Sequence, residues 1–235
     1  MVEVRYFFAK REQEINVYFD FLEKTITQKA HLQFKDKAIE SIQVELFPTL
    51  RANTVMMLYN MMEAVMRQCI DAIHLAISDE KAPVSYGVAI PNIQKIWIEY
   101  AYNNFQKNDA SGQIWDILQS ISNDVINIVE VNDDDQSYLS KVKGVNISGG
   151  VDLRKAKMLA AKYGWNMSTI TAGSHALTIK TNRNLLAHGR LSFNECGNRF
   201  QLSELQIIKA DIFLFLTQII DAIDNYLSQQ NYKKV

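Results

Sequence analysis

Residues 49–78 constrain the fold most, because they carry the longest uninterrupted helical pattern in the chain. Pro48 stands where such a helix can begin, and Pro83 follows its expected end. Apolar residues recur along one side at helical spacing: Val55, Leu58, Met62, Val65, Met66, Cys69, Ile73, Ala76 and Ile77. Polar residues fall on the opposite side: Asn53, Asn60, Glu63, Arg67, Asp71 and His74. At 1.5 Å per residue this helix would span roughly 45 Å, which predicts a helical bundle built along it.

The rest of the chain also favours helices, since only 3 Pro and 9 Gly interrupt 235 residues. We predict an all-α fold in one domain, 1–235, in which residues 1–44 form an N-terminal helical extension that serves as a packing face or a dimer element. Further helices are expected at 2–31, from Pro91 to Phe105, and at 113–129, 153–163, 174–188 and 204–228. Loops are expected at 108–112, 132–135 and 144–150, a short strand or helical turn at 34–44, and a connector or short hairpin at 191–202.

Several of these predicted helices carry end signals. Asp152 is a good N-cap, and Gly164 and Gly189 stand where C′ glycines stop a helix. Ser203 and Gln206 have the spacing of a capping box before the last helix.

Net charge and cysteine spacing limit which nucleic-acid, zinc and redox sites the chain can have. The net charge of −1 gives no global basic field, so nucleic-acid binding needs a local patch. Residues 180–199 offer one, with Lys180, Arg183, Arg190 and Arg199 against Glu195 alone. Cys69 and Cys196 lie in no C-x-x-C motif, so no zinc or redox site is expected. No metal and no cofactor is expected elsewhere either.

The chain also lacks the signals of export and membrane insertion. Its first residues carry no basic segment followed by an apolar run, and no stretch of about 18 apolar residues occurs. We therefore expect a cytoplasmic protein that does not enter a membrane.

The stretch with the most chemical content is Thr181–Arg190, at the end of the predicted helix 174–188. It places a permanent cation, Arg183, five residues before an imidazole, His188. Cleaving RNA without a metal requires a group that moves protons near neutral pH and a cation that stabilises charge on the phosphoryl oxygens. His188 and Arg183 are the residue types that supply these two functions.

The same stretch resembles the R-x(4–6)-H signature of the HEPN superfamily, whose active members are metal-independent ribonucleases. Arg183 is followed by Asn184, and Ala187, His188 and Gly189 close the motif in a form common there. The segments 50–53 and 59–63 are similar to the long helix of small stand-alone bacterial HEPN proteins, the MAE-type branch. The resemblance implies a homodimer in which two copies of the motif form one cleft.

Helix geometry places Arg183 and His188 on different faces, and of the three ways to bring them together the resemblance favours a site completed by a second chain. On a regular helix, Arg183 and His188 point about 140° apart, whereas Asn184 and His188 share a face with Thr181. A distorted last turn or a long swing of the Arg183 side chain are the alternatives. The resemblance places the long helix beside the motif helix, so Asn60 or Glu63 would support Arg183 or His188.

Each of these assignments has a plainer alternative. His188 and Gly189 also make an ordinary helix stop, with Arg183 on a solvated flank. Asn60 and Glu63 also fit the wet face of an amphipathic helix. Arg67 and His74 match the bare motif too, with six residues between them, but without its context, and we assign them to that wet face.

Arg51 falls on the apolar side, where a cation needs a carboxylate or a dimer contact. For Arg190 and Lys180, RNA contact and simple solvation are both open.

Regulation is constrained by one departure from the family pattern. Many HEPN toxins carry a Tyr two residues after the His, which a nucleotidyltransferase antitoxin modifies. Here that position is Arg190, so silencing by this modification is not available. An antitoxin or other regulatory protein is a partner compatible with the resemblance.

The sequence therefore predicts a metal-independent endoribonuclease, a toxin or defence effector acting on RNA through Arg183 and His188 of both chains of a homodimer. The alternative is a non-catalytic HEPN-like module that binds RNA, a nucleotide or a protein. A third reading is a purely structural helical adaptor.

Overall fold

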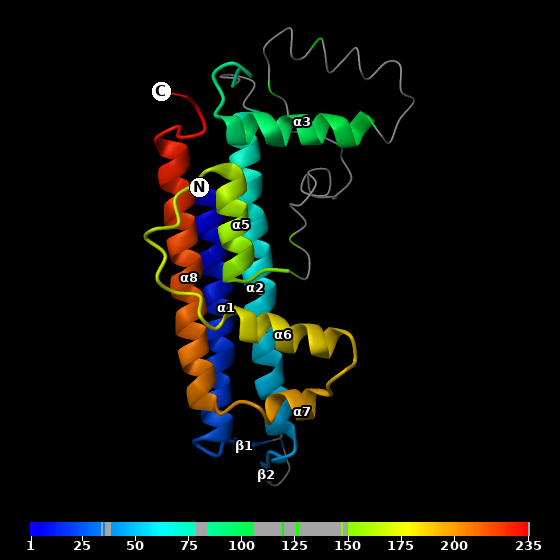
Figure 1. Ribbon diagram of the computed structural model, residues 1–235. Coiled ribbons are helices and arrows are strands. Elements are labelled where there is room, and N and C mark those ends of the chain that lie inside the picture. The colour runs from blue at the N-terminus through cyan, green and yellow to red at the C-terminus, as the bar shows by residue number, and fades with distance from the viewer. Residues whose placement is uncertain are drawn as a thin grey trace.

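The computed structural model describes residues 1–33, 35, 39–78, 84–105, 119, 126, 147 and 150–234, and the backbone alone for 100–105. Three long helices lie side by side along the molecule: α1 (Val2–Ile26), α2 (Leu46–Ile77) and α8 (Leu202–Ser228) (Figure 1). Four shorter helices surround them: α3 (Pro91–Phe105), α5 (Leu153–Tyr163), α6 (Ala176–Ala187) and α7 (Phe193–Gly197). The described residues form an all-α bundle, as predicted.

The only strands in the described part of the chain form a minimal hairpin after α1. β1 (His31–Leu32) pairs antiparallel with β2 (Glu40–Ser41), with His31 opposite Ser41. The prediction that helix 2–31 continues to residue 31 is therefore wrong, and of the two readings of 34–44 the structure contains the strand. Lys29 adopts the left-handed region at φ 53°, which turns the chain without the glycine that would have signalled it.

α2 lies at the centre of the bundle and contacts α1, α6, α7 and α8. Pro48 lies in its first turn, where a missing backbone N–H is tolerated, so α2 begins slightly before the predicted residue 49. Among residues 49–78 only Asn60 and Leu75 are exposed. The predicted apolar side is buried apart from the half-buried Ala76, and the predicted polar side is half-buried or exposed apart from His74, so the two-faced pattern holds except at His74. Because neighbouring helices cover most of the circumference of α2, its polar side is also largely enclosed.

His74 shows the consequence of this enclosure most clearly. We assigned it to a wet face, but its side chain is fully buried, and its Nε2 lies 2.7 Å from the Tyr163 hydroxyl. The Tyr226 hydroxyl in turn donates to the backbone oxygen of Tyr163 at 2.7 Å, which links α2, α5 and α8. Burial lowers the pKa of His74 to about 4. His74 is therefore a neutral core residue.

This burial predicts an acid-sensitive contribution to stability. An unfolded His74 takes up a proton below about pH 6.5, while the folded protein resists it down to about pH 4, so folding is opposed as the pH falls through this window. We expect the stability advantage of wild type over His74→Gln to shrink by about 2 kcal/mol between pH 7 and pH 5. Denaturant unfolding of both proteins at each pH measures the difference.

The titration of Asp71 changes the stability in the opposite direction, but it does not affect the difference between wild type and His74→Gln. Burial raises its pKa to about 6, so its contribution grows as the pH falls, and it is present in both proteins. A stability difference that stays constant from pH 7 to pH 5 would contradict the buried neutral state of His74.

The helices around the predicted motif have the expected ends. Asp152 caps α5, accepting a 2.7 Å hydrogen bond from the Lys155 N–H, and Gly164 ends the helix at φ 94°. α6 covers most of the predicted 174–188, and Gly189 follows it at φ 64°. Its end is a Schellman motif, because Gly189 N–H bonds Leu186 O and Arg190 N–H bonds Leu185 O.

The segment after α6 differs from the prediction. Within the predicted connector or hairpin 191–202, the chain forms the short helix α7. The capping box lies at Ser192 and Glu195, and the one predicted at Ser203 and Gln206 is wrong, because α8 already begins at Leu202 without a side-chain cap. The predicted helix 113–129 and the loops 108–112, 132–135 and 144–150 lie outside the described residues, apart from positions 119, 126, 147 and 150.

Candidate functional site

Arg183 points inward from α6 onto α2. Its guanidinium carbon lies 4.6 Å from the centre of the Tyr59 ring, and Nη2 lies 4.0 Å from Glu63 Oε2. Nη1 donates to Asn184 Oδ1 at 3.2 Å. The side chain is 23% exposed, and its buried Nε has no acceptor among the described residues. Arg183 is thus a cation in a fixed position, with one face on an aromatic ring.

The Tyr59 ring is the surface against which the Arg183 guanidinium packs. It is fully buried, and burial raises its pKa to about 12, so its hydroxyl stays protonated. That hydroxyl accepts a 3.3 Å hydrogen bond from the backbone N–H of Val151. Glu63 lies one turn further along α2 and also faces Arg67, whose Nη2 is 3.6 Å away. Sequence reasoning singled out Glu63 but missed Tyr59, although their spacing of four residues places both on one face of α2.

His188 lies at the exposed end of α6. It occupies the C-cap of α6 and is exposed, and no hydrogen bond or ion pair joins it to Arg183 within the described structure. The two side chains diverge as the helix geometry predicts, since α6 keeps its regular course up to Ala187. One chain therefore presents the imidazole to solvent and the guanidinium to its own core.

The remaining predicted site residues take different positions. Asn184 is half-buried and contacts Arg183, whereas Asn60 is exposed on α2. Lys180 makes a close ion pair with Asp152, the N-cap of α5, so its charge is already matched. Arg190 is exposed directly after the Schellman glycine. RNA contact by Lys180 and Arg190 stays a prediction.

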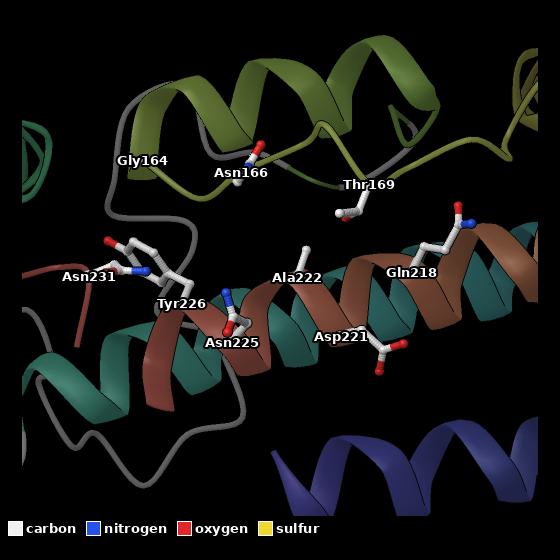
Figure 2. Close-up of a pocket in the computed structure, with 9 residues that line it drawn as sticks. All are labelled: Gly164, Asn166, Thr169, Gln218, Asp221, Ala222, Asn225, Tyr226 and Asn231. Atoms are coloured by element: carbon white, nitrogen blue, oxygen red, sulfur yellow. The ribbon is translucent and has the colours of Figure 1, made fainter. Parts of the chain in front are cut away.

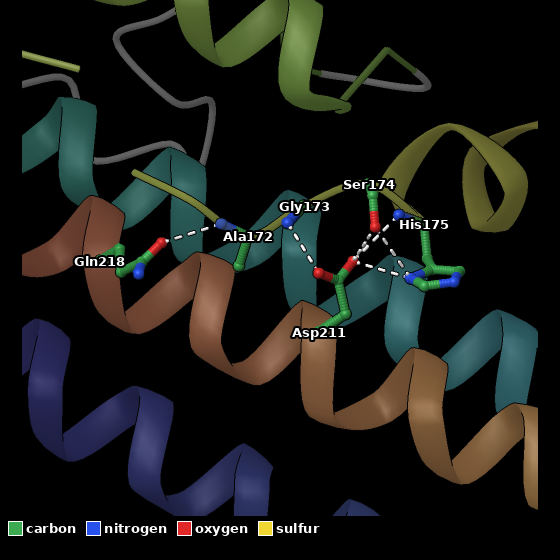
Figure 3. A network of polar contacts seen from close by, with 6 residues as sticks. All are labelled: Ala172, Gly173, Ser174, His175, Asp211 and Gln218. Carbon is green, nitrogen blue, oxygen red and sulfur yellow. Dashed lines mark hydrogen bonds and ion pairs between the residues drawn. The ribbon is translucent and has the colours of Figure 1, made fainter. Parts of the chain in front are cut away.

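A second polar cluster fixes the start of α6. Asp211 on α8 accepts hydrogen bonds from the backbone N–H groups of Gly173 and His175 at 3.0 and 2.9 Å, and its Oδ2 lies 3.0 Å from His175 Nδ1 (Figure 3). Ser174 Oγ lies 3.1 Å from the same Nδ1. A Ser-His-Asp relay needs the serine and the aspartate on opposite ring nitrogens, so this cluster is a helix clamp, not a nucleophile site.

Nearby, Gln218 extends the attachment of the loop before α6 to α8. Its Oε1 accepts from the backbone N–H of Thr171 at 3.0 Å. The same oxygen accepts from the backbone N–H of Ala172 at 3.2 Å (Figure 3). The loop leading into the motif helix is thereby held along α8 by two side chains.

A cavity of about 470 Å³ lies between the loop that follows α5 and the C-terminal half of α8 (Figure 2). Polar side chains dominate its lining: Asn166, Thr169, Gln218, Asp221, Asn225 and Asn231. Several are already engaged, since Gln218 holds backbone N–H groups and Asp221 pairs with Arg5 at 2.8 Å. Neither Arg183 nor His188 lines this cavity.

The described residues contain neither a metal-binding cluster nor a membrane-spanning helix. No group of three or more His, Cys, Asp or Glu side chains there could hold a metal ion. None of the described helices has the length and apolar character needed to cross a membrane.

Comparison with known proteins gives one match. No curated protein and no solved structure matches the chain significantly. The profile of the family described as HEPN_MAE_28990-like HEPN matches residues 6–232, which include α2 with Tyr59 and Glu63 and α6 with Arg183 and His188. This span covers nearly the whole chain, so the protein belongs to the HEPN superfamily, in its MAE_28990-like family.

Proposed function

We propose that this protein is a metal-independent endoribonuclease that acts as a toxin or defence effector, with Arg183 and His188 as its catalytic residues. The observation that supports this most is that α6 carries a fixed cation at one position and an exposed imidazole at another. Tyr59, Glu63 and Asn184 hold a permanent cation in place, while His188 is exposed at a helix end. A fixed cation and an accessible imidazole are what cleavage of a phosphodiester needs.

In the proposed reaction the 2′-hydroxyl of RNA attacks the adjacent phosphorus as the bond to the 5′-oxygen breaks. One His188 takes the proton from the 2′-hydroxyl, and another supplies a proton to the departing 5′-oxygen. Arg183 stabilises the negative charge that builds on the non-bridging oxygens. The products are a 2′,3′-cyclic phosphate and a 5′-hydroxyl.

The site requires two chains, because Arg183 and His188 diverge in one. In a homodimer that faces one α6 end towards the other, His188 of each protomer would reach a phosphate near Arg183 of its partner. Asn184 lies on the stripe of α6 shared by Thr181 and His188, so it would line the same face. An antitoxin or other regulatory protein would act by covering this face.

The alternative function is a non-catalytic module that binds RNA, a nucleotide or a protein. One observation favours it: a carboxylate of the same chain, Glu63, already lies 4.0 Å from Arg183. A guanidinium matched in this way contributes less to a transition state than one facing an unmatched anion.

The test is incubation of the pure protein with single-stranded RNA in excess EDTA. We expect cleavage that EDTA does not suppress and that leaves cyclic phosphate ends. Mixing wild type with an excess of His188→Ala should lower the activity per wild-type chain, because a mixed dimer keeps only one of the two histidines that the reaction uses. No cleavage at any protein concentration would favour the binding module, and an activity per wild-type chain that stays constant on mixing would exclude the shared site.

A further inference from the structure

Two arginines near the motif differ from the other paired arginines of the described residues, because no carboxylate holds them. Most paired cations of the described residues face a carboxylate: Arg5, Arg11, Lys24, Arg67, Lys162, Lys180 and Arg183. Arg51 and Arg199 instead contact side-chain amides within the described part of the chain. An amide oxygen orients a guanidinium without neutralising it, so both keep a full positive charge for another anion.

Arg51 lies near the start of α2, with its stem half-buried against α7. Its Nη2 donates to Asn198 Oδ1 at 3.4 Å, and its buried Nε has no acceptor among the described residues. Asn198 is itself fixed, because its Nδ2 donates to Asn194 Oδ1 at 2.9 Å. Of the two contacts expected for Arg51, no carboxylate of the described residues pairs with it, and the dimer contact stays a prediction. The guanidinium therefore keeps donors available.

Arg199 follows α7 and is held in the same manner from α6. Its Nη1 donates to Asn182 Oδ1 at 3.2 Å, and Asn182 Nδ2 donates to Thr178 O at 2.9 Å. The charge of Arg199 also acts on Glu195, but hydrogen bonds from Ser192 are the main cause that lowers the pKa of Glu195. Ser192 N and Oγ both lie 2.8 Å from one Glu195 oxygen, so that carboxylate is committed to capping α7.

The fold brings both arginines to the end of the bundle that carries the motif. α7 packs against the start of α2 so closely that Gly197 touches the backbone of Pro48, and α6 adjoins both (Figure 1). Asn182, which holds Arg199, directly precedes Arg183 in α6. An RNA strand bound at the motif would therefore continue from the motif over α7.

We propose that Arg51 and Arg199 bind backbone phosphates of single-stranded RNA beside the motif, as a phosphate-binding track separate from the cleavage site. The proposal rests on the proposed function for its substrate, but it concerns binding and can be measured without cleavage. The two arginines supply charge-assisted hydrogen bonds to phosphate oxygens and read no base.

The experiment measures the affinity of His188→Ala protein for a labelled single-stranded RNA at salt concentrations from about 50 to about 200 mM. Binding through phosphate contacts weakens steeply over this range of salt. We expect Arg51→Gln and Arg199→Gln each to weaken binding roughly 5- to 10-fold and to reduce the salt slope by about 0.7 per lost contact. Arg11→Gln on α1 removes the same charge from an exposed ion pair with Glu14 and should change neither. Arg199 is exposed, so its variant tests the track even if Arg51→Gln lowers stability.

The outcomes separate this inference from the proposed function. Unchanged affinity and slope in both variants, or equal weakening in Arg11→Gln, would overturn the track even if wild type cleaves RNA. Loss of affinity in both variants supports the track even if wild type cleaves nothing. Single-stranded DNA of the same sequence should lose affinity equally, and a loss confined to RNA would overturn the assignment to phosphate.

Discussion

Replacing His188 by alanine should lower the rate of RNA cleavage by at least about 100-fold, the usual contribution of a positioned proton-transfer group. The fold should be unaffected, because His188 is exposed and the end of α6 is fixed by backbone hydrogen bonds around Gly189. The measurement is the cleavage rate in EDTA at saturating protein, together with the thermal midpoint of unfolding.

His31→Ala is the matched control for this variant. His31 is also exposed, but it lies on β1, in the hairpin after α1. We expect wild-type cleavage from His31→Ala, and unchanged cleavage in His188→Ala would remove His188 from the mechanism.

Gly197→Ala should produce the largest loss of stability. A Cβ at this position would lie 1.7 Å from the backbone oxygen of Pro48, and neither backbone can move without separating α7 from α2. We expect a loss of about 3 kcal/mol in the free energy of unfolding, at the upper end of the cost of overpacking a core. Denaturant unfolding measures it.

Gly189→Ala provides the comparison, because it changes the same atoms without a clash. No atom lies within 4 Å of a Cβ placed there, and only its φ of 64° opposes alanine, at a cost of about 1 kcal/mol. Equal losses in the two variants would mean that the close approach of α7 to Pro48 does not contribute to stability.

The sequence predicted the helices best where capping residues and glycines mark their ends. Asp152 and Gly164 delimit α5, and Gly189 ends α6, because these residues act on backbone groups a few positions away. The end of α1 was missed, since Lys29 takes a conformation that sequence assigns to glycine. Local signals therefore predict local structure well.

The environment of the central helix could not be predicted in the same way. Periodicity gives the direction of a side chain but not the number of helices that surround it, so His74 was placed in solvent although Tyr163 covers it. The partner of Lys180 is Asp152, 28 residues away, and that pairing depends on tertiary packing.

The candidate site likewise has one part that depends on local sequence and another that depends on tertiary packing. The opposite directions of Arg183 and His188 follow from helix geometry and were predictable. The ring of Tyr59 beneath Arg183 was not, because it depends on where α6 crosses α2. The resemblance to the HEPN superfamily rested on the pattern around Arg183 and His188 and on the segments 50–53 and 59–63, all of which are local in sequence.

The junction at the start of α5 connects to the motif by two independent routes. Val151 donates its N–H to the hydroxyl of Tyr59, the ring on which Arg183 lies, and Asp152 grips Lys180, one turn before Arg183 on α6. A displacement of Val151 and Asp152 would therefore act on the Arg183 guanidinium both through the Tyr59 ring and through α6. The position of this cation thus depends on the packing of α5 as well as on the contact between α6 and α2.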